Sequence, residues 1–193
     1  MRTETKDILK AWLAVSIAFA IASHGVSFGS DFLLTILISA VTVGIGFLAH
    51  ELSHKWVAQK HGCLAEFRSF DSMLLLAILL SLFGFVFVAP GGVFIHGPGS
   101  QRYKGKIAAA GPFASLAIAL VFFFLTLLLP GTHLSRISIY GFHINSWLAL
   151  FNLLPFWMLD GQKVFVWNKK VYFGLLAFSV GFLVLGGLLL RAS

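Results

Sequence analysis

The stretch from Ala49 to Ala58 reads A-H-E-L-S-H-K-W-V-A and closes a long apolar run that begins at Phe32. His50 and His54 are four residues apart, so on a helix they project from one face, and two imidazoles so placed can bind one zinc ion. Glu51 lies on the adjoining flank, where a carboxylate can take a proton from a zinc-bound water without becoming a ligand. The pattern H-E-x-x-H therefore indicates a metal hydrolase centre.

The helix that carries this motif is expected to lie in lipid. The eighteen residues from Phe32 to Ala49 contain no Asp, Glu, Lys, Arg or His. Ionisable side chains are costly in a bilayer, and those that occur there are functional candidates by default. The alternative is that the two histidines and the glutamate merely neutralise one another at a helix end.

Composition also indicates a membrane protein. Of 193 residues, 59% are hydrophobic and 11% are charged, and no soluble domain of this length could bury so much apolar surface. The net charge of +7 could suggest a nucleic acid partner, but the basic residues are scattered through short connections. Such residues are typical of cytoplasmic flanks and headgroup contacts. We therefore expect the lipid bilayer, and no nucleic acid, as a partner.

The expected fold is an all-α polytopic membrane protein with about five or six transmembrane helices, a small interfacial β element and a re-entrant segment. We expect residues 1–193 to form a single domain with a core at 32–161 and peripheral helices in 1–31 and 162–193. The first apolar stretch could be a signal peptide, but the positive residues before it favour an uncleaved helix with a cytoplasmic N-terminus. The apolar segments lie at 11–28, 32–59, 107–129, 147–159 and 171–190.

The segment at 147–159 carries polar features that are unusual for a membrane helix. Pro155 frees a backbone carbonyl and bends the chain, and Asn152 is a costly amide to place in lipid. Asp160-Gly161 follows directly. This segment is therefore expected to be interrupted and to line a polar cavity.

Three motifs together resemble the site-2 protease family of intramembrane zinc metalloproteases. They are His50-Glu51-Leu52-Ser53-His54, Ala110-Gly111-Pro112, and Asn152-x-x-Pro155-x-x-x-Leu159-Asp160-Gly161, in the family's order. The resemblance covers roughly residues 32–161 and implies a minimal form without a PDZ domain.

The resemblance implies a role for several residues. His50, His54 and Asp160 would hold one zinc ion, Glu51 would be the general base, and Asn152 would steady the scissile carbonyl or its oxyanion. Gly91 and Gly92, before a short strand at Val93, resemble the family's inner sheet edge, which would receive an unwound segment of a transmembrane protein substrate.

The carboxylates of the chain limit the third ligand without reference to the family. After His54 the acidic residues are Glu66, Asp71 and Asp160, and Glu66 is too close to the motif and in the wrong element. The extended motif with a third histidine is also absent, because Val57 and Lys60 occupy its positions. Asp160 remains as the candidate, with His96 as the alternative.

Topology follows if Asp160 is that ligand. His54 lies near the inner end of its helix, and Asp160 lies just before Lys163, so an odd number of crossings must separate them. The stretch 73–89 is therefore expected to form a re-entrant or interfacial hairpin that turns near Gly84, between short strands at 64–70 and 93–96. Five full spans would then place the N-terminus inside, the C-terminus outside and the active site near the cytoplasmic face of the cell membrane.

The function favoured by these residues is zinc-assisted hydrolysis of a peptide bond within or near a transmembrane segment. A membrane transporter for zinc or another cation is the main alternative, and it predicts acidic residues and histidines spread through the membrane depth. An inactive protease-like scaffold is a third hypothesis. The presence of every catalytic part disfavours it.

Overall fold

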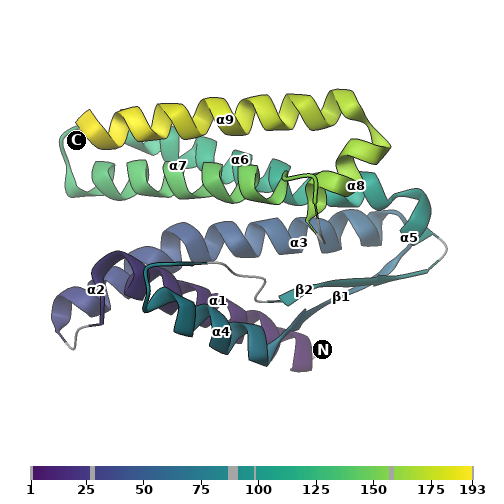
Figure 1. Cartoon of the computed structure of the whole chain (residues 1–193), viewed down its shortest axis with the longest axis horizontal. Coiled ribbons are helices and arrows are strands. Elements are labelled where there is room, and N and C mark those ends of the chain that lie inside the picture. Colours follow the sequence, from purple (N-terminus) through teal and green to yellow (C-terminus); the bar gives the residue numbers. More distant parts are fainter. Residues whose placement is uncertain (1, 27–28, 87–90, 98, 157–158, 193) are drawn as a thin grey trace. The chain divides into compact units, whose positions relative to one another are not determined.

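The computed structural model describes the whole chain except residues 1, 27–28, 87–90, 98, 157–158 and 193. It shows a helical protein with one small two-stranded sheet (Figure 1). In chain order its elements are α1 (Arg2–His24), α2 (Ser30–Ser39), the π-helical turn η1 (Ala40–Gly44), α3 (Ile45–Lys60), β1 (Leu64–Ser69), α4 (Asp71–Ser81), β2 (Gly91–His96), α5 (Gly99–Arg102), α6 (Lys104–Leu128), α7 (His133–Asn152), α8 (Asp160–Trp167) and α9 (Lys169–Ala192).

The chain divides into two compact units. The first unit comprises Met1–Leu48 and Glu66–Phe94, and the second comprises Ala49–Ala65 and Ile95–Ser193. The expectation that residues 1–193 form a single domain stays a prediction.

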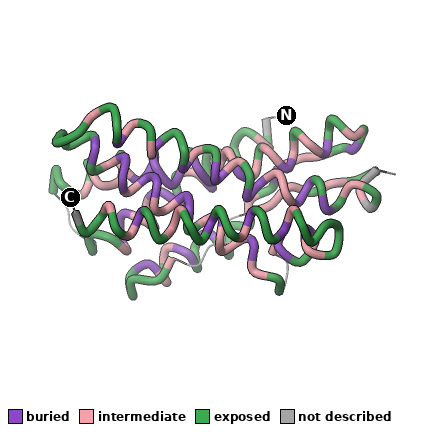
Figure 2. Tube along the Cα trace, turned by 90° about the horizontal axis from the view of Figure 1, so that it is seen from above, coloured by how far each residue is buried: buried purple, intermediate pink, exposed green. Residues whose placement is uncertain are grey.

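Several helices have the length and composition of membrane spans. Within the described residues four qualify, at Thr3–His24, Ser30–Lys60, Lys104–Leu128 and Lys169–Arg191. On α6 the buried positions recur at intervals of three or four residues, and apolar side chains such as Phe113, Val121 and Phe124 are exposed between them. Buried and exposed positions alternate along the helices of the chain (Figure 2). One face of α6 thus packs against protein while the other offers apolar side chains that suit lipid.

In the first unit α1 packs against the helix formed by α2 and η1. A side chain at Gly44 would meet the ring of Trp12, with the Cβ atom 2.5 Å from Trp12 Nε1. The same nitrogen donates a hydrogen bond to the carbonyl of Ala40, at 3.1 Å. The glycine therefore allows the close approach of an indole whose polar atom needs a partner in the apolar interior.

The sheet confirms the two short strands that the sequence predicts, with β2 beginning two residues earlier. Gly91 lies beside Arg68 and Ser69, whereas Gly97 lies beside Cys63 and Leu64. One residue number rises as its neighbour's falls, so β1 and β2 are antiparallel.

Between the strands, α4 covers 11 residues and ends at Ser81. Gly84 follows in a turn with φ of 78°. Residues 87–89 of the expected hairpin lie outside the described residues.

In the second unit α7 packs against α6 and α9. Its extent differs from the sequence prediction, because the helix spans His133–Asn152 instead of beginning near Trp147. Thr132 starts it, accepting a hydrogen bond from the backbone N–H of Ser135 at 3.1 Å. The helix ends three residues before Pro155, so the proline follows the helix instead of bending it.

The polar residues of α7 before Trp147 explain this error. Ser138, Asn145 and Ser146 lower the hydropathy of the segment, yet all three are buried. Each donates to the backbone carbonyl four residues earlier, at distances of 2.7–2.8 Å. Packing inside a helical bundle thus accommodates polar side chains that a hydropathy pattern leaves outside the apolar segments.

Candidate metal centre

The two histidines of the H-E-x-x-H motif lie one turn apart on α3. His50 is 3% exposed and His54 is 8% exposed. Their rings meet edge to face with centroids 4.8 Å apart. The third member, Asp160, is the first residue of α8 and is 8% exposed.

One carboxylate oxygen of Asp160 approaches both rings. Its Oδ2 atom lies 3.3 Å from His50 Nε2 and 3.0 Å from His54 Nε2. Within the described part of the chain, these three side chains form a group whose ligand atoms all lie within 4.8 Å of one another. Ligands about 2.0–2.1 Å from a tetrahedral zinc ion lie about 3.3 Å apart, so the group fits zinc. The sequence alternative, His96, is exposed on β2 and lies outside this group.

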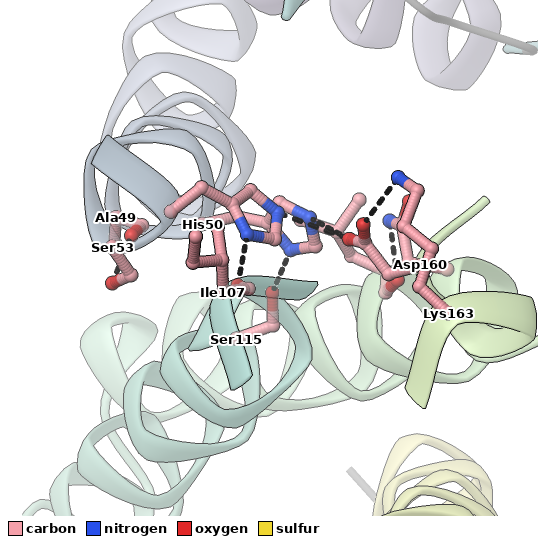
Figure 3. Close-up of polar contacts among 10 residues, drawn as sticks. Ala49, His50, Ser53, Ile107, Ser115, Asp160 and Lys163 are labelled. Atoms are coloured by element: carbon pink, nitrogen blue, oxygen red, sulfur yellow. Dashed lines mark hydrogen bonds and ion pairs between the residues drawn. The ribbon is translucent and has the colours of Figure 1, made fainter. Parts of the chain in front are cut away.

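Helix α6 orients the two imidazoles through their other nitrogens (Figure 3). The Nδ1–H of His54 donates to the carbonyl of Ile107, at 2.7 Å. His50 Nδ1 lies 3.0 Å from the hydroxyl oxygen of Ser115. Such partners set the tautomer and the ring direction, and here they leave both Nε2 atoms directed at Asp160. This arrangement is typical of a histidine pair that binds a metal.

Gly111 brings α6 close enough to make these contacts. A Cβ atom at this position would collide with the rings of His54 and His50. The middle residue of the Ala110-Gly111-Pro112 motif is therefore a glycine because the imidazoles occupy the space beside it. This contact couples the second motif of the resemblance directly to the first.

Asp160 is positioned from two sides. Its Oδ1 atom accepts a hydrogen bond from Lys163 Nζ at 3.2 Å, which leaves Oδ2 for the histidines. A Cβ atom at Gly161 would collide with the backbone of Leu153, so the end of α7 passes directly against the start of α8. Burial raises the pKa of the Asp160 carboxyl, but His54 and His50 outweigh burial and hold this pKa below its ordinary value. The carboxylate is thus ionised, which is the form that binds a metal.

The remaining predicted site residues lie outside the ligand group. Glu51 is half-buried beside the histidines on α3. Asn152 is the last residue of α7, and its side-chain amide donates to the Leu148 carbonyl at 2.9 Å. Gly91, Gly92 and Val93 belong to β2, in the first unit.

Sequence reasoning missed three residues that support the ligands. Ser115 and the carbonyl of Ile107 hold the imidazoles, and Lys163 holds the carboxylate. In the sequence, Lys163 serves only to place Asp160 near the inner side. Its spacing of three residues from Asp160 on a helix was a usable signal for an ion pair, whereas no local pattern distinguishes Ser115 from other serines in membrane helices.

The contact with Ser115 predicts a graded loss of metal affinity. Ser115→Ala removes the hydrogen-bonding partner of His50 Nδ1, so zinc affinity should fall by about 10–100-fold without loss of the fold. Ser53→Ala is the matched control, because the Ser53 hydroxyl bonds to the Ala49 carbonyl on the same helix and touches no ligand. The measurement is competition for zinc against a chromophoric chelator. Equal affinities in the two variants would contradict the proposed support of His50.

Comparison with known proteins gives relatives along most of the chain. A protein of Methanocaldococcus jannaschii named "Putative zinc metalloprotease MJ0611" is 42% identical over 172 residues, which cover 88% of this chain and 86% of the relative. Proteins with the same designation are Rip3 of Mycobacterium tuberculosis, 33% identical over 67% of this chain and 31% of its own length, and YwhC of Bacillus subtilis, 28% identical over 64% and 65%.

Two further comparisons found no match. No family model matches the chain, and no solved structure is significantly similar to it. The names of the relatives agree with a group of side chains that fits zinc. The chain therefore belongs to the site-2 protease family of zinc metalloproteases.

Proposed function

We propose that this protein is an intramembrane zinc metalloprotease that hydrolyses a peptide bond within or near a transmembrane segment of its substrate. The observation that carries the proposal is the buried group of His50, His54 and Asp160, two members of which belong to a helix long and apolar enough to cross a membrane. A hydrolytic metal site on a helix that crosses the membrane is better placed for a substrate in the membrane than for a soluble one.

The chain's own residues divide the chemistry among them. His50, His54 and Asp160 would hold one zinc ion, which supplies Lewis acidity that activates water and polarises the peptide carbonyl. Glu51 accepts a proton from the attacking water and delivers it to the leaving amine. Asn152 steadies the carbonyl oxygen as negative charge develops there, after exchanging its bond to Leu148 for one to substrate.

A transmembrane substrate must unwind before this chemistry can occur. The amides of a helix are hydrogen-bonded and shielded, so the segment to be cleaved needs other hydrogen-bonding partners when it becomes extended. Pairing with the edge of β2 at Gly91, Gly92 and Val93 offsets the bonds that unwinding breaks.

The active site is proposed to lie near the cytoplasmic face of the cell membrane, in a protein with five spans. His54 contacts Ile107, the fourth residue of α6, so α3 ends on the face where α6 begins. The chain between the end of α3 and the start of α6 must then cross the membrane an even number of times. Helix α4, at about 16 Å for 11 residues, is too short for a hydrocarbon core of about 30 Å. We therefore treat α4 as part of a hairpin that does not cross the membrane. Helix α7 is then a span in addition to the four candidates.

A cation transporter is less consistent with the distribution of carboxylates. In the second unit the acidic residues are Glu51 and Asp160, and both belong to the proposed active site. No series of acidic groups continues from there along the helices of this unit to provide an ion pathway. The carboxylates are gathered where hydrolysis needs them.

The role of Glu51 predicts a separation between binding and catalysis. Glu51→Gln should retain zinc and the fold but lower cleavage by several orders of magnitude, because the general base is lost while the ligands remain. The measurement is mass spectrometry of products from membrane-spanning peptides, together with the zinc content of the purified variant. Asp160→Ala provides the contrast, since it should lose zinc as well as activity. Substantial proteolysis by the Glu51→Gln variant would rule out the proposed mechanism.

The topology predicts which positions are accessible from each side of the membrane. In a Cys63→Ser background, single cysteines at Gln59 and Ser100 should react with an impermeant reagent from the same face of oriented vesicles. A cysteine at Thr132, beyond the far end of α6, should react from the opposite face. Labelling of positions 59 and 100 from opposite faces would show that α4 crosses the membrane and would contradict the five-span arrangement.

A further inference from the structure

Two carboxylates of α1 hydrogen-bond to the backbone of β1. Glu4 Oε1 accepts from the N–H of Phe67 at 2.9 Å, and Asp7 Oδ2 accepts from the N–H of Ser69 at 3.4 Å. Further along α1, Lys10 Nζ donates to Oδ1 of Asp71, the first residue of α4, at 3.3 Å. All of these groups belong to the first unit.

The spacing of these contacts fits one face of a helix that lies along one edge of a strand. Glu4, Asp7 and Lys10 recur every three residues and so share one face of α1. Phe67 and Ser69 are two residues apart, so their N–H groups point to the same edge of β1. The carboxylate oxygens thus occupy the position that the carbonyl oxygens of another strand would take.

One face of β1 is packed as well. Phe67 is 1% exposed and packs edge to face on Phe47, with ring centroids 6.1 Å apart. The other edge of β1 is paired with β2. Both edges of β1 therefore have partners.

The outer edge of β2, in contrast to both edges of β1, has no strand or carboxylate partner among the contacts that the structure describes. In the two-stranded sheet that the structure describes, β2 has β1 as its one strand neighbour. A Cβ atom placed on Gly92 would meet no atom within 4 Å, whereas one on Gly91 would collide with the carbonyl of Arg68. Gly91 thus allows the close pairing of β1 with β2, and the face of the sheet at Gly92 is open.

We infer that Glu4 and Asp7 act as strand mimics that close the β1 edge, so that an extended substrate segment can pair with the sheet only along β2. The inference rests on the proposed function and adds residues that select one edge. An open strand edge pairs with any extended segment that reaches it. Closing one of two edges restricts the substrate to pairing with one strand.

The first arm of the test measures the closure in the full-length protein without substrate. Glu4→Ala combined with Asp7→Ala should increase hydrogen exchange at the amides of Phe67 and Ser69 by about tenfold or more. The amide of Arg68, which points to the opposite edge, should change little. Lys10→Ala is the matched control, because it removes an exposed ion pair from the same face of α1 and should leave both amides protected. Unchanged exchange in the double variant would overturn the inference.

The second arm maps where substrate pairs. A membrane-spanning peptide with a photoreactive residue is cross-linked to the Glu51→Gln protein, which cannot cleave it, and the sites are identified by mass spectrometry. Cross-links should fall on β2 alone and should extend to β1 when Glu4→Ala and Asp7→Ala are added. Replacement by Glu4→Gln and Asp7→Asn, which retains an acceptor oxygen at each position, should restore the restriction to β2.

Two results would contradict the inference in different ways. Cross-links to β1 in the parent protein would show that its edge is open. Absence of cross-links to either strand, in a protein whose unaltered form cleaves the same peptide, would overturn edge selection and leave the protease function intact. If the unaltered protein does not cleave the peptide although cross-links still fall on β2, that result would instead count against the proposed function.

Discussion

A buried ionisable group must find its partners inside the protein, and this constraint governs the site. His50, His54 and Asp160 are all nearly inaccessible, and each has a second contact besides the shared one. The imidazoles hydrogen-bond to Ile107 and Ser115, and the carboxylate hydrogen-bonds to Lys163. In so buried a position, every unpaired polar atom would be costly. The ligand group therefore draws on α3, α6 and α8 together.

The same constraint explains the small residues around the site. Gly111 leaves space for two rings, and Gly161 lets the end of α7 pass the start of α8. Larger side chains would separate the elements and leave polar atoms without partners. The glycine positions in the two downstream motifs thus follow from close approach to the ligands and to the chain that carries them.

Much of this arrangement could be predicted from the sequence, because its signals are local. The helix through His50 and His54 and the strands on either side of α4 were visible as periodicity, spacing and turn residues. Asp160 followed from a short inventory of carboxylates and from the resemblance. What could not be predicted depends on contacts between distant segments, such as Ser115 with His50 or Glu4 with Phe67. The predicted start of α7 was wrong, because polar side chains that hydrogen-bond to the backbone of their own helix can be buried by packing although their hydropathy is low.

The central claim is that two imidazoles and one carboxylate of this chain hold zinc. X-ray absorption at the zinc edge of the purified, zinc-loaded protein tests it most directly. We expect a shell of light atoms at about 2.0–2.1 Å, with the multiple-scattering signature of two imidazoles and with oxygen in the remaining positions. A third imidazole in the shell, or a sulfur atom at about 2.3 Å, would contradict the assignment of Asp160 and with it the proposed site.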